Sequence, residues 1–266
     1  MGKLFSKPKV KAPPPGAVVI SDEATKVDLS SRGIRQVPRE ILQLKKLAIL
    51  NLGFNRLTVL DPDISLLTTL TKLTLSGNAL KTLPEEIGDL VELKQLIVSK
   101  NCLRSLPQSL DKLSKLELLD AMLNKIEELP RSVGRLRALK RLKLSVNQLH
   151  ELPDELGHLS ELEEFDISSN HITELPDCFD ALESLEHLNI RNNLLDTLPK
   201  SICRCSRLRV LDARNNELTA VPKRIGDLGA LKSLYLSQNQ LESLPSSIGS
   251  LPLLHTLHLD QNQLWA

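Results

Sequence analysis

Aromatic residues are scarce in this chain: Phe, Tyr and Trp together make up 2% of its 266 residues. A globular core normally draws much of its buried area from aromatic side chains. The apolar content is nevertheless ordinary, at 41%, so Leu, Ile and Val must supply most of the core. That imbalance indicates many small, similar layers rather than one irregular interior.

The chain also lacks an excess of either charge, with 34 basic and 33 acidic residues and a formal net charge of +1. No global field attracts nucleic acid, and no basic stripe is interleaved with aromatics. No apolar stretch has the length of a transmembrane helix, no signal-peptide core is present, and no Asn-x-Ser/Thr acceptor sequence occurs. We therefore expect a cytoplasmic protein, no nucleic-acid partner, and free thiols at Cys102, Cys178, Cys203 and Cys205.

One asparagine recurs at a fixed spacing without a gap or an insertion, at Asn55, Asn78, Asn101, Asn124, Asn147, Asn170, Asn193, Asn216, Asn239 and Asn262. The surrounding pattern is L-x-x-L-x-L-x-x-N-x-L-x-x-L-P, which residues 70–84 show in full, followed by EEIGDLVE. A degenerate first unit places Arg32 at the Asn position. Such self-similarity at a fixed period is the signature of a repeat protein.

Each recurrent position has a physical task. The L-x-L segment predicts a short strand that pairs in parallel with the strand of the next repeat. The Asn ends the strand, and its amide can donate to and accept from backbone groups that the turn would leave unpaired. The Leu-Pro step predicts a short helical or 3-10 segment, because Pro suits a first helical position. In I-G-x-L, the Gly lets that segment approach closely as it packs back onto the sheet.

One repeat cannot bury its own leucines, so the repeats must stack. The sequence therefore predicts an α/β solenoid shaped as a horseshoe, with a parallel concave sheet and short helical or 3-10 segments on the convex side. In the Asn55 repeat the Pro slot holds Asp61 and Pro62 follows. We expect the convex turn there to be shifted by one residue.

Two regions follow from the pattern: a basic, Pro-rich arm over residues 1–20 and a repeat domain over residues 21–266. The domain has the degenerate first repeat, about ten repeats in phase and an incomplete last one. It stops before its final Leu-Pro turn, and solenoids normally carry a capping unit there. A truncated or spliced form, a cap made by Trp265, and a cap made by a partner all remain open.

The unit with LPxxIGxLxxL after the strand resembles the intracellular Ras-group leucine-rich-repeat family over about residues 24–266. The resemblance implies a leucine-rich-repeat fold. It also implies a concave sheet that binds partner proteins, often small GTPases or their regulators. No GTPase-contacting residue carries over, because those positions are the variable ones in the pattern.

Residues six, four, two and one positions before each Asn should point away from the core, because strand side chains alternate between faces. Apolar residues there have no packing explanation, and a smaller apolar group at Ile49 and Phe54 lies nearer the N-terminus. The candidate interaction residues on the concave face are Ile97, Leu118, Asp120, Met122, Leu123, Arg141, Lys143, Val146, Glu164, Asp166, His187, Arg191, Asp212, Arg214 and Tyr235.

An apolar centre flanked by charges of both signs is typical of a protein–protein interface. The alternative is that these charges merely pair across neighbouring strands and keep the sheet soluble.

Nothing in the pattern indicates an active site, and we expect no enzyme, no metal and no cofactor. Cys203 and Cys205 fall in the small Gly slot and the core Leu slot of the I-G-x-L segment, so packing explains both. Glu164 and Asp166 could form an acid/base pair, but an open sheet has no water-excluded pocket to shift their pKa values. We expect no small-molecule substrate.

The N-terminal arm begins MGKLFSKPKVKAPPPG and matches the N-myristoylation motif M-G-x-x-x-[ST], with Gly2 as acceptor. The alternative is an unmodified basic tail. One acyl chain binds membranes weakly, and neighbouring lysines add attraction to anionic lipid. The lysines expected to do so are Lys3, Lys7, Lys9 and Lys11.

The leading hypothesis is a protein-binding scaffold tethered to the cytoplasmic face of a membrane and acting in small-GTPase (Ras-type) signalling. A structural or adhesion adaptor without a GTPase is the first alternative. A regulatory subunit of an enzyme such as a phosphatase is the second.

Overall fold

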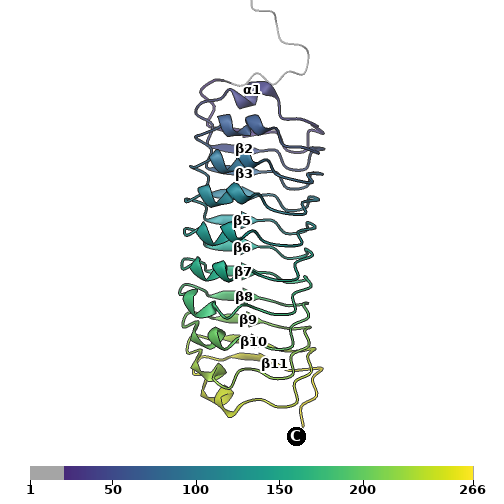
Figure 1. The fold of residues 1–266 in the computed structure, drawn as a ribbon, viewed down its shortest axis with the longest axis vertical. Helices are drawn as coiled ribbons and strands as arrows, with labels where there is room; N and C mark the ends of the chain where they lie inside the picture. Colours follow the sequence, from purple (N-terminus) through teal and green to yellow (C-terminus); the bar gives the residue numbers. More distant parts are fainter. Residues whose placement is uncertain (1–20, 266) are drawn as a thin grey trace, which may run out of the picture.

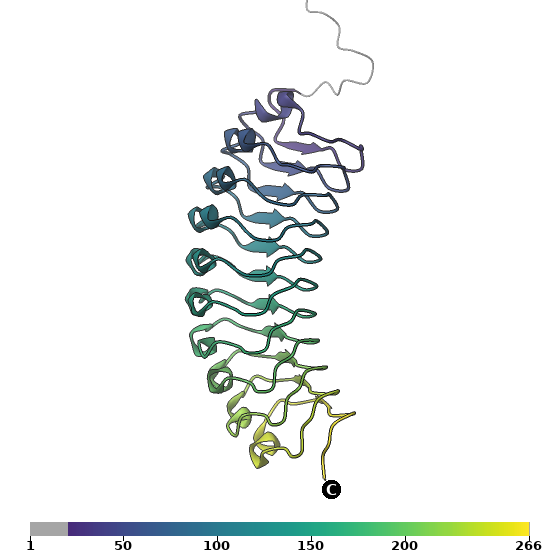
Figure 2. The ribbon, with the colours of Figure 1, turned by 45° about the vertical axis from the view of Figure 1, so that its right-hand side comes forward.

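Short parallel strands stack in chain order into one open sheet, with a layer of short helices on its convex side (Figure 1, Figure 2). The computed structural model describes residues 21–265 of the chain. Within them the sheet has eleven strands, β1 (Lys26–Asp28), β2 (Ile49–Asn51), β3 (Lys72–Thr74), β4 (Gln95–Ile97), β5 (Leu118–Asp120), β6 (Arg141–Lys143), β7 (Glu164–Asp166), β8 (His187–Asn189), β9 (Val210–Asp212), β10 (Ser233–Tyr235) and β11 (Thr256–His258).

The convex layer consists of one helical turn per repeat. The first is the α-helix α1 (Arg39–Leu42). The others are 3-10 helices, η1 (Pro62–Leu66), η2 (Glu85–Asp89), η3 (Gln108–Lys112), η4 (Arg131–Arg135), η5 (Asp154–His158), η6 (Phe179–Ala181), η7 (Lys200–Arg204), η8 (Ile225–Asp227) and η9 (Ser246–Ser250). None of the helices within residues 21–265 combines the length and the apolar character that a membrane crossing requires.

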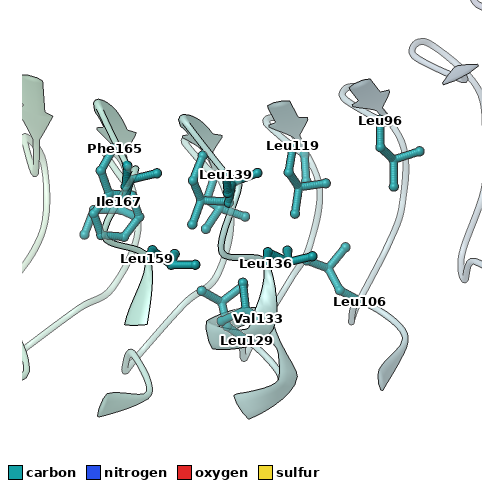
Figure 3. Packing of buried hydrophobic residues seen from close by; sticks show 14 of the residues in the cluster. Leu96, Leu106, Leu119, Leu129, Val133, Leu136, Leu139, Leu159, Phe165 and Ile167 are labelled. Carbon is teal, nitrogen blue, oxygen red and sulfur yellow. The ribbon is translucent and has the colours of Figure 1, made fainter. Parts of the chain in front are cut away.

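The core lies between these two layers and runs unbroken along the solenoid. Strand residues pair with their equivalents one repeat later, so Leu96 of β4 lies beside Leu119 of β5. Both leucines are fully buried, and they point from the sheet toward Leu136 and Val133 of the convex side (Figure 3). The prediction of a leucine-filled α/β solenoid is confirmed.

The repeated asparagine joins each repeat to the one before it. In Asn147, Nδ2 donates to the carbonyl oxygens of Ala121 and Leu144 at 3.0 and 2.9 Å, and Oδ1 accepts from the Ile126 amide at 3.0 Å. The equivalent bonds recur from Asn55 to Asn262. Because these carbonyl and amide groups lie where the strand turns into the core, the asparagines form a ladder that satisfies them without water.

The convex turns differ from the sequence prediction in two details. Pro84 lies at the N-cap of η2 with an extended backbone (φ −70°, ψ 150°), not at its first helical position. The turn of the Asn55 repeat is not shifted: η1 starts at the same place in its repeat as η2 does. Asp61 takes the N-cap position there, and its side chain accepts from the Asp63 amide at 3.0 Å. A capping carboxylate at that position therefore replaces the rigid proline without moving the turn.

The glycine of the I-G-x-L segment lets its convex turn pack closely against the convex turn of the next repeat, not against the sheet. A β-carbon added at Gly134 would stand 2.3 Å from the Glu155 carbonyl oxygen, and one added at Gly88 would stand equally close to that of Ser109. Carboxylates reinforce the same stacking, since Glu85 accepts from the Ser109 amide at 2.8 Å. That hydrogen bond holds the pKa of Glu85 below its usual value.

The residue just before each asparagine adopts a left-handed backbone. Phe54, Leu123 and Val146 have φ values of 55°, 55° and 57°. The remaining repeats have a non-glycine residue in the same conformation, except for the repeat with Gly77. From Ser31 to Gln238, the amide of this residue donates to a carbonyl of the next repeat, as Leu123 does to Ser145 at 2.9 Å. The inter-repeat hydrogen bonds therefore impose this backbone whatever the side chain.

Candidate interaction surface

The concave face consists of three residues from each repeat. They are the first and the third residue of the strand and the residue two places after the strand ends, as in Leu118, Asp120 and Met122. The register places Leu118 between Gln95 and Arg141, and Ile97 beside Asp120. Leu118 and Ile97 are therefore diagonal neighbours, each half-buried. Met122 lies beyond Asp120 and is also half-buried. The apolar centre is a diagonal stripe interrupted by polar residues.

The prediction that Leu123 and Val146 are outward strand residues is wrong. β5 and β6 end three residues earlier, and the left-handed backbone of Leu123 and Val146 lies in the turn that follows each strand. Both remain exposed, at 40% and 45%. They form part of a separate ridge along the carboxyl ends of the strands.

Charged residues in the middle of the face have partners either on the neighbouring strand or two residues later in their own repeat. Lys143 Nζ lies 2.8 Å from Glu164 Oε1. Asp166 accepts from the Ser168 amide at 3.0 Å and from its hydroxyl at 2.7 Å, and Asp120 accepts from the Met122 amide at 3.2 Å. These groups keep the sheet polar, as the alternative explanation requires.

Arg141, His187 and Arg191 are exposed on the same surface. Among the described residues, Arg141 forms no ion pair. The Arg191 Nε donates to Asn192 Oδ1 at 3.3 Å, which leaves the rest of its guanidinium directed to solvent. These three side chains keep donors free for a ligand.

The C-terminal part of the face holds a stacked cluster. Arg214 Nε donates to Asp212 Oδ1 at 2.9 Å, and its guanidinium carbon lies 4.8 Å from the centre of the Tyr235 ring. The hydrogen bond that Arg214 donates to Asp212 raises the pKa of Arg214 above its ordinary value. Tyr235 in turn meets His258 edge-on, with ring centres 5.1 Å apart. The sequence-based list of interaction residues contains Asp212, Arg214 and Tyr235. It omits His258, although His258 falls on the outward strand pattern.

The cysteines lie in the interior or at its edge. Cys203 and Cys205 are buried, and burial raises the pKa of the Cys205 thiol to about 12. Its sulfur also contacts the Phe179 carbonyl oxygen at 3.2 Å. Within residues 21–265, no three His, Cys, Asp or Glu side chains are grouped as metal ligands. The proposed lipidation site, Gly2 with Lys3, Lys7, Lys9 and Lys11, lies outside the described residues.

The described fold and repeats have clear relatives. A leucine-rich-repeat family model matches residues 22–80, 175–218 and 206–264, a leucine-rich-repeat-region model matches residues 79–170, and a third leucine-rich-repeat model matches residues 161–182. No curated protein matches the sequence.

Solved structures give the same answer. A leucine-rich-repeat protein of Leptospira interrogans is 38% identical with a TM-score of 0.88, and the match covers 92% of this chain and 62% of that one. The Arabidopsis receptor kinase HAESA, solved with the peptide hormone IDA and the co-receptor SERK1, is 30% identical with a TM-score of 0.70 over 91% of this chain and 47% of that one.

The plant receptor RGFR1, solved with RGF2, is 29% identical with a TM-score of 0.72 over 86% of this chain and 42% of that one. The chain thus spans less than two thirds of each of these relatives. Proteins of this fold are typically binding scaffolds without catalysis. From its matched repeats, its stacked parallel strands and its asparagine ladder, the chain belongs to the leucine-rich-repeat family.

Proposed function

We propose that this protein is a non-catalytic scaffold that binds a protein partner through its concave face. The observation that carries the proposal is the diagonal apolar stripe of Ile97, Leu118 and Met122, which no other part of residues 21–265 covers. Half-buried apolar side chains on an open face, beside unpaired cationic groups such as Arg141, are a common composition for an interface. Peptide-bound receptors among the structural relatives support a protein or peptide ligand.

The partner we propose is a small GTPase of the Ras type or one of its regulators, held at the cytoplasmic face of a membrane. The resemblance to the Ras-group repeats supports the partner class, and the motif at Gly2 with its lysines supports the tether. Two weak attachments, an acyl chain and a basic segment, act together in stable membrane binding. A scaffold of this kind would concentrate its partner at the membrane.

The concave assignment is tested by replacing two residues of the stripe, Leu118→Asp with Met122→Asp. Both side chains face away from the core, so the variant should keep its melting temperature and lose its partner in affinity capture followed by mass spectrometry. Val91→Asp is the matched control, because Val91 is a 46% exposed apolar residue on the convex side, just after η2. Capture that survives the double variant and disappears with the control would place the interface elsewhere.

The tether is tested separately by Gly2→Ala, which removes the acceptor amine for the acyl chain. The variant should move from the membrane fraction to the soluble fraction while keeping its protein partner. A variant that stays in the membrane fraction would contradict acylation at Gly2. The identity of the captured protein separates GTPase signalling from an adhesion adaptor or an enzyme's regulatory subunit.

A further inference from the structure

The left-handed residues form a continuous ridge along the carboxyl ends of the strands. Their amides donate in sequence to the next repeat, so residues of adjacent repeats are direct neighbours. We use the name N-terminal ridge for Phe54, Gly77, Lys100, Leu123 and Val146. The C-terminal ridge continues it with Ser169, Asn192, Asn215, Gln238 and Gln261.

The two halves of the ridge differ in how well their residues suit this backbone. Asn tolerates a left-handed conformation because its short polar side chain bonds locally. In the C-terminal ridge, Asn215 Nδ2 donates to Asn192 Oδ1 at 2.9 Å, and Asn192 Nδ2 donates to Ser169 Oγ at 3.2 Å. The fold alone therefore accounts for Ser169, Asn192 and Asn215 in that half.

The apolar side chains of the N-terminal ridge have no such explanation. Leu123 and Val146 have no side-chain polar atom with which to offset the strained backbone, and a β-branched residue at positive φ is an outlier. Both are also exposed, as is Phe54 at 59%. Hydrogen bonds between repeats impose the left-handed backbone, but nothing in the fold requires large apolar side chains to be exposed on it.

We infer that the N-terminal ridge binds an extended peptide segment that carries apolar side chains flanked by carboxylates. This inference rests on the proposed function and specifies where on the protein the partner is selected, and by what chemistry.

The charges around the ridge argue for an acidic segment. Each ridge residue and the asparagine after it lie in one of five four-residue windows, 53–56, 76–79, 99–102, 122–125 and 145–148. These windows hold three basic residues, Arg56, Lys100 and Lys125, and no acidic residue. All three are exposed, and among the described residues none forms an ion pair. Lys100 Nζ lies 6.0 Å from the centre of the Phe54 ring, so one apolar and one cationic contact are side by side.

The dimensions argue for an extended segment. Four repeat steps separate Phe54 from Val146, about 19 Å at about 4.8 Å per strand. An extended chain of about six residues covers that length at about 3.3 Å per residue. The strands follow an inward-curving arc (Figure 2), so a flat bilayer would meet the ends of the arc before its middle. A peptide can follow the arc, which favours it over a membrane surface.

The experiment uses the full chain and a triple variant, Phe54→Asn, Leu123→Asn and Val146→Asn. The probes are fluorescent peptides with Leu and Phe residues flanked by Glu, the same peptides flanked by Lys, and peptides with Ser in place of Leu and Phe. Fluorescence anisotropy should show that only the Glu-flanked apolar peptide binds, with affinity falling as salt is added. The triple variant should bind it at least about tenfold more weakly, a loss of one hot-spot contact or more.

Stability separates this outcome from simple damage. Asn suits the left-handed backbone, so the triple variant should melt at the same temperature as the parent chain or higher. Asn192→Ser with Asn215→Ser, in the C-terminal ridge, should leave peptide binding unchanged. Equal binding by the triple variant, a preference for Lys flanks, or binding only to phosphatidylserine vesicles would each overturn the inference.

The double variant and the triple variant distinguish a failure of the ridge inference from a failure of the proposed function. If Leu118→Asp with Met122→Asp abolishes partner capture while the triple variant retains it, the ridge inference is wrong and the concave assignment stands. If neither variant loses the partner, both are wrong.

Discussion

The ring of Phe54 lies against the α-carbon of Gly77: a β-carbon added at Gly77 would stand 2.7 Å from the ring. Gly77 itself has a φ of 69°. Gly77→Ala should therefore displace the Phe54 ring and add the cost of a left-handed alanine, about 1 kcal/mol. Chemical denaturation measures the stability loss, and peptide binding should weaken as it does for Phe54→Asn. An unchanged affinity would show that the ring position does not matter to the ligand.

The strain at Val146 predicts an unusual pair of stability changes. Val146→Asn should raise the free energy of unfolding by about 1 kcal/mol, because the left-handed backbone tolerates Asn better than Val. The reverse change at the equivalent position, Asn192→Val, should lower it by a similar amount. Urea denaturation of both variants checks the pair. Equal effects of the same sign would mean that the conformation carries no strain.

The asparagine ladder predicts a large loss of stability when one buried polar side chain is removed. Asn147→Ala removes the donors to Ala121 and Leu144 and the acceptor for Ile126, and it leaves those backbone groups buried. The expected cost is roughly 1–3 kcal/mol. The control is Gln148→Ala, an exposed neighbour whose loss should be within about 0.5 kcal/mol. Similar costs for the two variants in urea would refute the structural role of the ladder.

The buried thiols predict a weakening of the fold in alkali. Burial raises the pKa of Cys178 to about 11 and that of Cys205 to about 12, from 9.0. A thiol whose pKa is higher in the folded chain stabilises the fold below the unfolded value and loses that contribution as pH rises toward the folded value. The melting temperature should fall between pH 9 and pH 12.

Cys178→Ala isolates this effect. The variant should melt with a shallower pH dependence over that window than the parent chain does. At neutral pH, half-exposed Cys102 should react with a maleimide before buried Cys205. Identical pH profiles for parent and variant would exclude the thiol as the cause.

The sequence was sufficient for those parts of the fold that repeat. The spacing of Asn55 and its equivalents predicts the strands, their parallel register and the buried leucines, because stacking identical units gives each residue the same neighbours. The concave positions of Leu118 and Arg141 follow from the same alternation. The conformations of Leu123 and Val146 do not follow, because hydrogen bonds between repeats dictate their backbone and the residue type there varies.

Side-chain contacts between repeats with different residues could not be predicted from the sequence either. The turn after Asp61 stays in phase because η1 packs against η2 and because the Asp61 side chain caps η1 in place of the N-cap Pro. The placement of the Arg214 guanidinium over Tyr235 depends on side-chain directions across two repeats. In both cases a deciding neighbour is distant in the chain.

The central claim, that the concave face holds a protein partner, is tested most directly by site-specific photocrosslinking in cells. A photoreactive amino acid is placed at Arg141 on the concave face or at Val91 on the convex side, both exposed. We predict a covalent adduct with one protein from position 141 and none from position 91. Adducts from position 91 alone would contradict the account.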